Sequence, residues 1–233
     1  MKRLLLISSS RVHPTGYLDH CEEEMRDFLG PVRRVLFVPY ALRDWAGYAG
    51  RFRERLEKMG LEVDSLGSSP DPGSAVRSCP SLFVGGGNTF RLLHELYERD
   101  LIELIRARAR EGMPYLGASA GTNLACPSIK TTNDMPIVQP PSLEALGLVP
   151  FNINPHYLDP DPSSTHKGET REERIREFHE MNNPPVVGLR EGAMLRVEGS
   201  RMTLRGTSGA RLFLKGEIPR EIPIGGNLDF LLA

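Results

Sequence analysis

The sequence predicts an α/β fold with three layers, in which a mostly parallel β-sheet carries helices on both faces. Short apolar runs alternate with amphipathic stretches through the first half of the chain. Most of these runs are apolar without alternation, as in strands that are buried on both faces. The last third contains short alternating segments broken by Gly and Ser, which predict antiparallel strands that continue the sheet or pack at its edge.

Each predicted element follows from a local pattern. Strands are expected over residues 4–7, 35–38, 61–66, 81–84 and 114–116, and helices over residues 17–29, 45–59, 89–98 and 101–111. One face of the third helix carries apolar residues at helical spacing: Phe90, Leu93 and Tyr97. Residues 127–165 are rich in Pro, Asn, Asp and Ser, and we expect ordered loops there.

A charged helix is expected to begin near Thr170. Thr170 followed by Glu173 has the spacing of a capping box, in which each side chain bonds the other residue's backbone amide. The apolar face of this helix is thin and consists of Ile175, Phe178 and Met181.

Length and composition favour one globular domain spanning residues 1–233. A formal net charge of −1 gives no reason to expect nucleic acid or an anionic membrane as a partner. The first apolar run is too short for a signal peptide or a membrane span, so we expect a cytoplasmic protein. The three cysteines have neither metal-ligand nor disulfide spacing: Cys21, Cys79 and Cys126. A monomer or a homodimer is expected.

Ser119 lies in the segment "GASAG", between an apolar run and a helix-like stretch. This strand–turn–helix context is typical of a nucleophile elbow, a strained turn that leaves room only for Gly and Ala beside the reactive serine. The segment "VGGGNTF" also lies between a predicted strand and a predicted helix, and it matches no phosphate-binding motif. We therefore expect the backbone amides of Gly87 and Ala120 to bind a developing oxyanion.

A serine nucleophile needs a base, and six histidines are available. His156 is favoured because it follows an apolar segment in a loop downstream of the serine. His166 is the competitor, and His13 stays open. Three others fall in helical patterns, where structural or solvated roles are expected: His20, His94 and His179.

The acid that orients the histidine could be Asp134 or Glu191, and spacing alone does not choose between them. Asp134 could instead form an Asx-turn, and Glu191 could be a hairpin corner. Whichever acid does not orient the histidine could receive a substrate ammonium.

Several motifs together resemble the peptidase E family of aspartyl dipeptidases. They are "VGGGNTF", "GASAGTNLACP", "TTNDMPIV", "NPH" and "HKGETREERIRE", in this order, and the resemblance covers nearly the whole chain. It implies a fold like that of class I glutamine amidotransferases and hydrolysis of small Asp-X peptides without a metal or other cofactor. Ala118 departs from the family's frequent aromatic residue before the nucleophile, which could alter the pocket wall or the leaving-group preference.

The resemblance also implies roles for individual residues. Ser119 matches the nucleophile and His156 the base, while Asp134 and Glu191 each match one of two acids described for the family. Arg171 is the best match for an arginine that binds the substrate's aspartate side chain. Arg174 and Arg176 are expected on a solvated face, pairing with glutamates.

Three other functions compete with this hypothesis. An esterase or amidase for another substrate could use the same serine and histidine. A cyanophycinase-like enzyme would release aspartyl dipeptides from a polymer through an open groove. A non-enzymatic small-molecule binding module would keep the fold without the chemistry.

Overall fold

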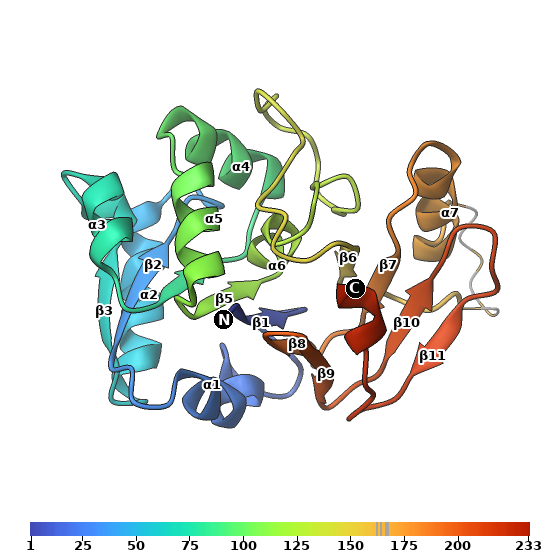
Figure 1. The fold of residues 1–233 in the computed structure, drawn as a ribbon, viewed down its shortest axis with the longest axis horizontal. Coiled ribbons are helices and arrows are strands. Elements are labelled where there is room, and N and C mark those ends of the chain that lie inside the picture. Colours follow the sequence, from blue (N-terminus) through green and yellow to red (C-terminus); the bar gives the residue numbers. More distant parts are fainter. Residues whose placement is uncertain (162, 164, 166–167) are drawn as a thin grey trace.

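Five adjacent parallel strands, running from one edge, form most of a seven-stranded sheet, as the apolar runs predict (Figure 1). The computed structural model describes residues 1–161, 163, 165 and 168–233. The parallel strands are β1 (Arg3–Ile7), β2 (Arg34–Val38), β3 (Glu62–Ser65), β4 (Leu82–Val84) and β5 (Tyr115–Ala118), in the spatial order β3-β2-β4-β5-β1. Since their carboxyl ends meet at one edge, this edge is where a site is expected.

Two antiparallel strands complete this sheet. β8 (Ala193–Glu198) pairs with β1, and β9 (Arg201–Gly206) pairs with β8. This confirms that antiparallel strands from the last third of the chain continue the sheet.

A second, four-stranded sheet was not predicted. Its order is β11-β10-β7-β6, formed by β6 (Asn152–Pro155), β7 (Val186–Leu189), β10 (Ala210–Phe213) and β11 (Arg220–Ile222). β6 lies in the segment that was expected to be loops. It was missed because its sequence, "NINP", is short and half polar, and because it becomes a strand only by pairing in parallel with β7. Local sequence carries little signal for such a strand.

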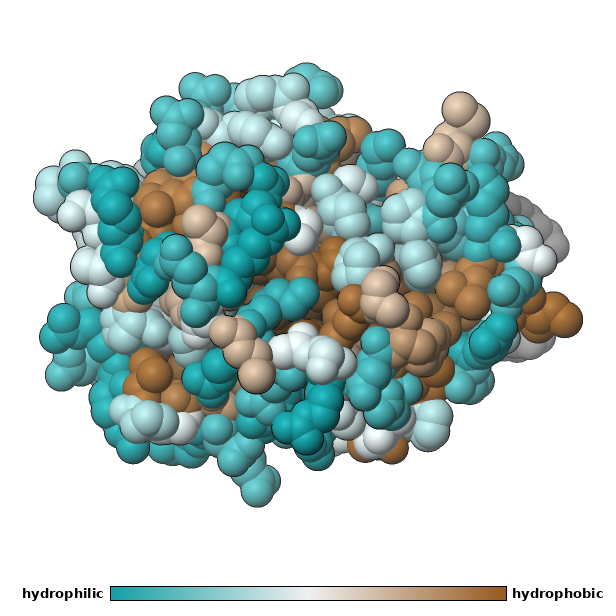
Figure 2. Space-filling view, viewed as in Figure 1, coloured by the Kyte–Doolittle hydropathy of each residue, from teal (hydrophilic) through white to brown (hydrophobic). Residues whose placement is uncertain are grey.

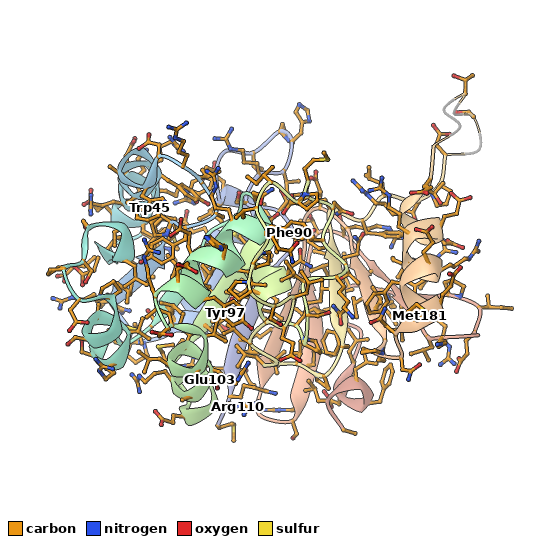
Figure 3. All side chains as sticks on the ribbon, turned by 90° about the horizontal axis from the view of Figure 1, so that it is seen from above. Trp45, Phe90, Tyr97, Glu103, Arg110 and Met181 are labelled. Carbon is orange, nitrogen blue, oxygen red and sulfur yellow. The ribbon has the colours of Figure 1, made fainter. Side chains whose placement is uncertain are left out.

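The predicted helices of the first half are confirmed. They are α1 (Glu22–Leu29), which the short 3₁₀ helix η1 (Asp19–Cys21) precedes, α2 (Trp45–Glu57), α4 (Thr89–Glu98) and α5 (Ile102–Glu111). Figure 3 shows Phe90 and Tyr97 along α4, and both pack against the core beside buried Leu93. Helix α3 (Pro72–Ser78), which the Asp71 side chain caps, was missed because it is only seven residues long.

Helices cover both faces of the large sheet (Figure 1). On one face, α1 and α2 bury Phe28 and Phe52 against alternate strand residues. On the other face, α3, α4, α5 and the short α6 (Ala120–Leu124) pack in a core that also includes Val187 and Leu212 of the second sheet. Because this core is continuous between the two sheets, we infer a single domain.

Helix α7 (Arg171–Met181) begins at the predicted capping box of Thr170 and Glu173. Its predicted apolar face is only partly correct. Ile175 is buried, but the Met181 side chain is 87% exposed, at the far end of the molecule from Trp45 in Figure 3. Met181 is the last residue of the helix, and it is outside the small core cluster that contains Ile175 and against which Phe178 packs.

The surface in Figure 2 is mainly hydrophilic on the face shown, with apolar residues visible between charged side chains. Within the described ranges, no helix combines the length and hydrophobicity needed to cross a bilayer. All three cysteines are buried and unpaired: Cys21, Cys79 and Cys126.

Candidate active site

Ser119 lies at a sharp turn between β5 and α6, with φ 54° and ψ −107°. This φ is unusual for a residue with a side chain and costs on the order of 1–3 kcal/mol. The flanking glycines explain how the turn fits. A Cβ on Gly117 would lie 2.4 Å from the carbonyl oxygen of Gly121, and a Cβ on Gly121 would lie 2.2 Å from that of Val84. Strand, turn and helix therefore approach more closely than any larger residue allows.

The glycine-rich loop after β4 lies directly against this turn. A Cβ on Gly86 would be 3.1 Å from the Cβ of Ser119, and Gly87 has a φ of +134° that favours glycine. Asn88 caps α4, its side chain accepting a hydrogen bond from the Arg91 amide. Among the described residues, the Gly87 and Ala120 amides have no hydrogen-bond acceptor. Both predicted oxyanion donors therefore carry free N–H groups beside the elbow.

His156 contacts the serine directly. Its Nε2 lies 2.8 Å from Ser119 Oγ. His156 follows β6 and also has a positive φ, of 53°. Its backbone amide donates to Ser8 Oγ at 2.9 Å, and that hydroxyl donates to the Leu189 carbonyl at 2.7 Å. Ser8, directly after β1, and Leu189 of β7 therefore hold a strained backbone in place through hydrogen bonds.

Glu191 contacts the other side of the imidazole, with its Oε1 2.8 Å from His156 Nδ1. It lies in a tight turn between β7 and β8, closed by a hydrogen bond from the Ala193 amide to the Arg190 carbonyl at 3.0 Å. Gly192 has a φ of +83° in this turn. The Glu191 side chain is 48% exposed.

Asp134 is occupied elsewhere. Its Oδ2 accepts hydrogen bonds from the Thr89 amide at 2.8 Å and from Thr89 Oγ1 at 2.5 Å. Thr132 Oγ1 donates to the same oxygen at 3.1 Å. The carboxylate thus stabilises the first turn of α4, where negative charge is favourable. The structure joins Ser119, His156 and Glu191 and leaves Asp134 out of that chain of contacts.

The remaining histidines have other surroundings. His179 is buried, and its Nε2 lies 3.0 Å from the Pro184 carbonyl, a structural role. His20 and His94 are partly buried on or before helices, and burial lowers the pKa of His20. His13 is exposed. His166 lies outside the described residues.

A pocket of about 690 Å³ opens over Ser119 and His156, a volume in the usual range for small-molecule sites. Gly86 and Gly87 form one wall, and α2 and the segment after β1 form the others. In the part of the chain that the structure describes, no group of three or more His, Cys, Asp or Glu side chains is placed to hold a metal ion.

Arg171 does not line this pocket. It is the first residue of α7 and is partly buried, and this burial, together with the charge of Arg174, lowers the pKa of its guanidinium. Arg174 pairs with Glu169 at 3.4 Å, and Arg176 pairs with Glu172. These two arginines therefore have the predicted surface role.

Three supporting residues were missed from the sequence. Ser8 holds the His156 amide, and it could have been noticed as a polar residue at the carboxyl end of a buried strand. Asn133 donates to the Pro155 carbonyl at 2.7 Å, directly before His156. Tyr48 lies so close to the glycine-rich loop that a Cβ on Gly85 would be 2.6 Å from its hydroxyl. Sequence gives no signal for Tyr48, because its position depends on how α2 packs.

A serine on an elbow beside a parallel sheet, with a histidine on its hydroxyl, defines the class of serine hydrolases. Within that class the chain belongs to peptidase family S51, whose model matches residues 4–205, and it is a serine-type peptidase. It is 56% identical to peptidase E of Streptomyces coelicolor, covering 98% of this chain and 94% of that protein. It is 50% identical to a probable alpha-aspartyl dipeptidase of Drosophila melanogaster, covering 99% and 98%.

Solved structures show the same fold. A putative peptidase E from Listeria monocytogenes aligns with a TM-score of 0.67 at 24% identity, covering 89% of this chain and 100% of that one. A peptidase from an acI-B1 actinobacterium aligns with a TM-score of 0.72 at 17% identity, covering 98% and 96%.

Proposed function

We propose that the protein is a dipeptidase that hydrolyses the bond after an unblocked N-terminal aspartate, through Ser119, His156 and Glu191. The observation that carries the proposal is the continuous line of two 2.8 Å contacts, from Ser119 Oγ through the imidazole to Glu191 Oε1. The aspartyl specificity rests on the names of the relatives.

Ser119 Oγ attacks the carbonyl carbon of the aspartyl residue while His156 Nε2 accepts its proton. A hydroxyl is a weak nucleophile until a neighbouring base takes its proton, and the 2.8 Å contact supports that transfer. Glu191 accepts the Nδ1–H hydrogen bond, which fixes the tautomer and stabilises the imidazolium as it forms.

The tetrahedral intermediate carries a negative charge on the former carbonyl oxygen. The amides of Gly87 and Ala120 are the proposed donors, because both are without acceptors among the described residues and both flank the elbow. Removing one such donor typically lowers turnover by about 10²–10³-fold.

His156 then donates its proton to the leaving amine, and the C–N bond breaks to leave an aspartyl ester on Ser119. Water attacks this ester, with His156 accepting a proton and returning it to Ser119 Oγ. Free aspartate is the second product, and the enzyme is regenerated.

Arg171 does not line the pocket over Ser119, and it is proposed as the ligand of the substrate's aspartate side chain on the resemblance of its motif. Its support is the motif match and a partly buried charge for which no carboxylate partner is seen among the described residues. Asp134 is not needed in the triad in this proposal, since it stabilises α4. The hydrogen bonds of its carboxylate with Thr89 and Thr132 all go to Oδ2, so among the described residues Oδ1 remains open to receive a substrate ammonium.

Hydrolysis of a panel of free and N-blocked Asp-X dipeptides, alongside short acyl esters, tests the function. We expect turnover of unblocked Asp-X, and loss of that turnover in Ser119→Ala by several orders of magnitude, with an unchanged thermal midpoint. Preference for acyl esters over Asp-X would favour the esterase alternative, and retained activity in Ser119→Ala would remove the serine from the mechanism.

A further inference from the structure

The pocket over Ser119 carries an excess of positive charge. Of its lining residues four are cationic and two are acidic: Arg11, Arg51, Arg55, Lys58, Asp19 and Glu54. A pocket lined mainly by one sign of charge attracts ligands of the opposite sign. Only those cations that have no partner within the protein are available to a ligand.

Two of the four cations already have partners. Arg55 pairs with Asp19 at 2.9 Å and with Glu22 at 2.6 Å, and its side chain is only 11% exposed. Lys58 pairs with Glu54 at 3.4 Å on the surface of α2. These contacts neutralise both charges within the protein.

Arg11 and Arg51 form no ion pair with any described residue, although both line the pocket. The Arg51 guanidinium carbon lies 5.6 Å from the centre of the Tyr48 ring, a cation–π contact that leaves its N–H groups free. The Arg11 backbone amide donates to the hydroxyl of Ser9, two residues earlier, at 3.1 Å. This hydrogen bond holds the Arg11 backbone in place.

Both arginines line the same pocket as Tyr48. Burial raises the pKa of this phenol, and the Tyr17 hydroxyl, the Gly86 amide and the charges of Arg51 and Arg11 oppose that rise. The two arginines thus enter the pocket from different segments, Arg11 from the chain after β1 and Arg51 from α2, and the pocket also includes the glycine-rich loop and Ser119. Two guanidinium groups that line the pocket of the nucleophile, and that have no ion-pair partner among the described residues, form a site for an anion.

We propose that Arg11 and Arg51 form a carboxylate-binding subsite of the pocket, which holds a carboxylate of the dipeptide while Ser119 attacks. The inference rests on the proposed function and adds substrate-binding residues to it. Arginine suits this role because its planar fork can bind a carboxylate through two parallel hydrogen bonds.

An Asp-X dipeptide offers two carboxylates, the aspartate side chain and the C-terminal group of residue X. If the subsite binds the C-terminal group, it selects dipeptides over longer peptides, since a longer chain has a neutral amide there. If it binds the aspartate side chain, it selects Asp over Asn and acts together with, or in place of, Arg171.

Arg11→Gln, Arg51→Gln and the double variant test the proposal. Arg43→Gln is the matched control, because Arg43 is exposed, lies two residues before α2 and does not line this pocket. Each variant is assayed on Asp-Ala, on Asp-Ala amide and on Asn-Ala. Binding of uncleaved Asp-Ala is also measured by calorimetry in the Ser119→Ala background.

We expect the double variant to raise KM for Asp-Ala and to weaken its binding by about 10- to 100-fold, as loss of charge-assisted hydrogen bonds predicts. Wild-type preference for Asp-Ala over its amide, lost in the double variant, assigns the subsite to the C-terminal carboxylate. If the double variant instead loses affinity equally for Asp-Ala and for Asp-Ala amide, and no longer discriminates against Asn-Ala as the wild type does, the subsite is assigned to the aspartate side chain.

KM and binding within about twofold of the Arg43→Gln control on every substrate would overturn the proposal. This result differs from failure of the proposed function, in which the wild-type protein itself would not hydrolyse Asp-Ala. Turnover by the wild type with unaffected arginine variants would therefore reject only the subsite.

Discussion

Replacing Glu191 by Gln is expected to lower kcat strongly while leaving the fold intact. The carboxylate accepts the hydrogen bond of His156 Nδ1 at 2.8 Å. A neutral amide can instead donate to Nδ1, which places the proton on Nε2 and prevents that nitrogen from accepting the proton of Ser119.

The solvent exposure of the Glu191 side chain determines how large a loss of kcat we expect in Glu191→Gln. A fully buried orienting acid contributes up to about 10⁴-fold in kcat. The Glu191 side chain is 48% exposed, so water can replace part of its interaction. We therefore expect a loss of about 10²–10³-fold, which corresponds to about 3–4 kcal/mol of transition-state stabilisation.

Asp134→Asn is the matched control. It keeps the side-chain shape but removes the charge from the first turn of α4, where Oδ2 accepts the Thr89 amide. We expect a loss of about 0.5–2 kcal/mol of stability, which lowers the thermal midpoint by a few degrees, with kcat within a fewfold of wild type.

Steady-state kinetics on Asp-Ala and thermal unfolding of both variants make the comparison. A kcat in Glu191→Gln within about threefold of wild type, together with a large loss of kcat in Asp134→Asn at unchanged stability, would refute the assignment of the acid.

Three further predictions follow from single contacts. Gly121→Ala places a Cβ 2.2 Å from the Val84 carbonyl oxygen and should lower the free energy of unfolding by at least about 1–3 kcal/mol. Gly50→Ala is the control, because its Cβ would lie in open space on α2, and it should be neutral or stabilising. Equal thermal midpoints for the two variants would contradict the predicted steric clash. Ser8→Ala removes the acceptor of the His156 amide and should lower kcat about tenfold with KM nearly unchanged, and a change in KM alone would place Ser8 in binding. Arg171→Ala should raise KM for Asp-X at least about tenfold, and an unchanged KM would assign this arginine to the surface.

The large sheet and the elbow could be predicted because their signals are local. A buried parallel strand needs a run of apolar residues, and residues 4–7 and 35–38 supply it wherever they pair. Gly117 and Gly121 are similarly informative, since only a close backbone approach explains small residues on both sides of Ser119.

The choice between Asp134 and Glu191 could not be predicted, because it depends on pairings between distant segments. Glu191 reaches His156 only because β6 and β7 pair in parallel, which brings the two strand ends together. β6 itself is four residues long, with two Asn side chains that bond neighbouring loops, so its pattern resembles a loop. Arg11 and Arg51 likewise line one pocket only because the segment after β1 and helix α2, which are distant in the sequence, both border it.

The most direct test of the central claim is mass spectrometry of the protein quenched during turnover of an activated aspartyl ester. The account predicts a covalent aspartyl group located on Ser119 by peptide mapping, present in the wild type and absent in Ser119→Ala. Steady turnover with no covalent group, or an aspartyl group on another residue that persists in Ser119→Ala, would contradict it.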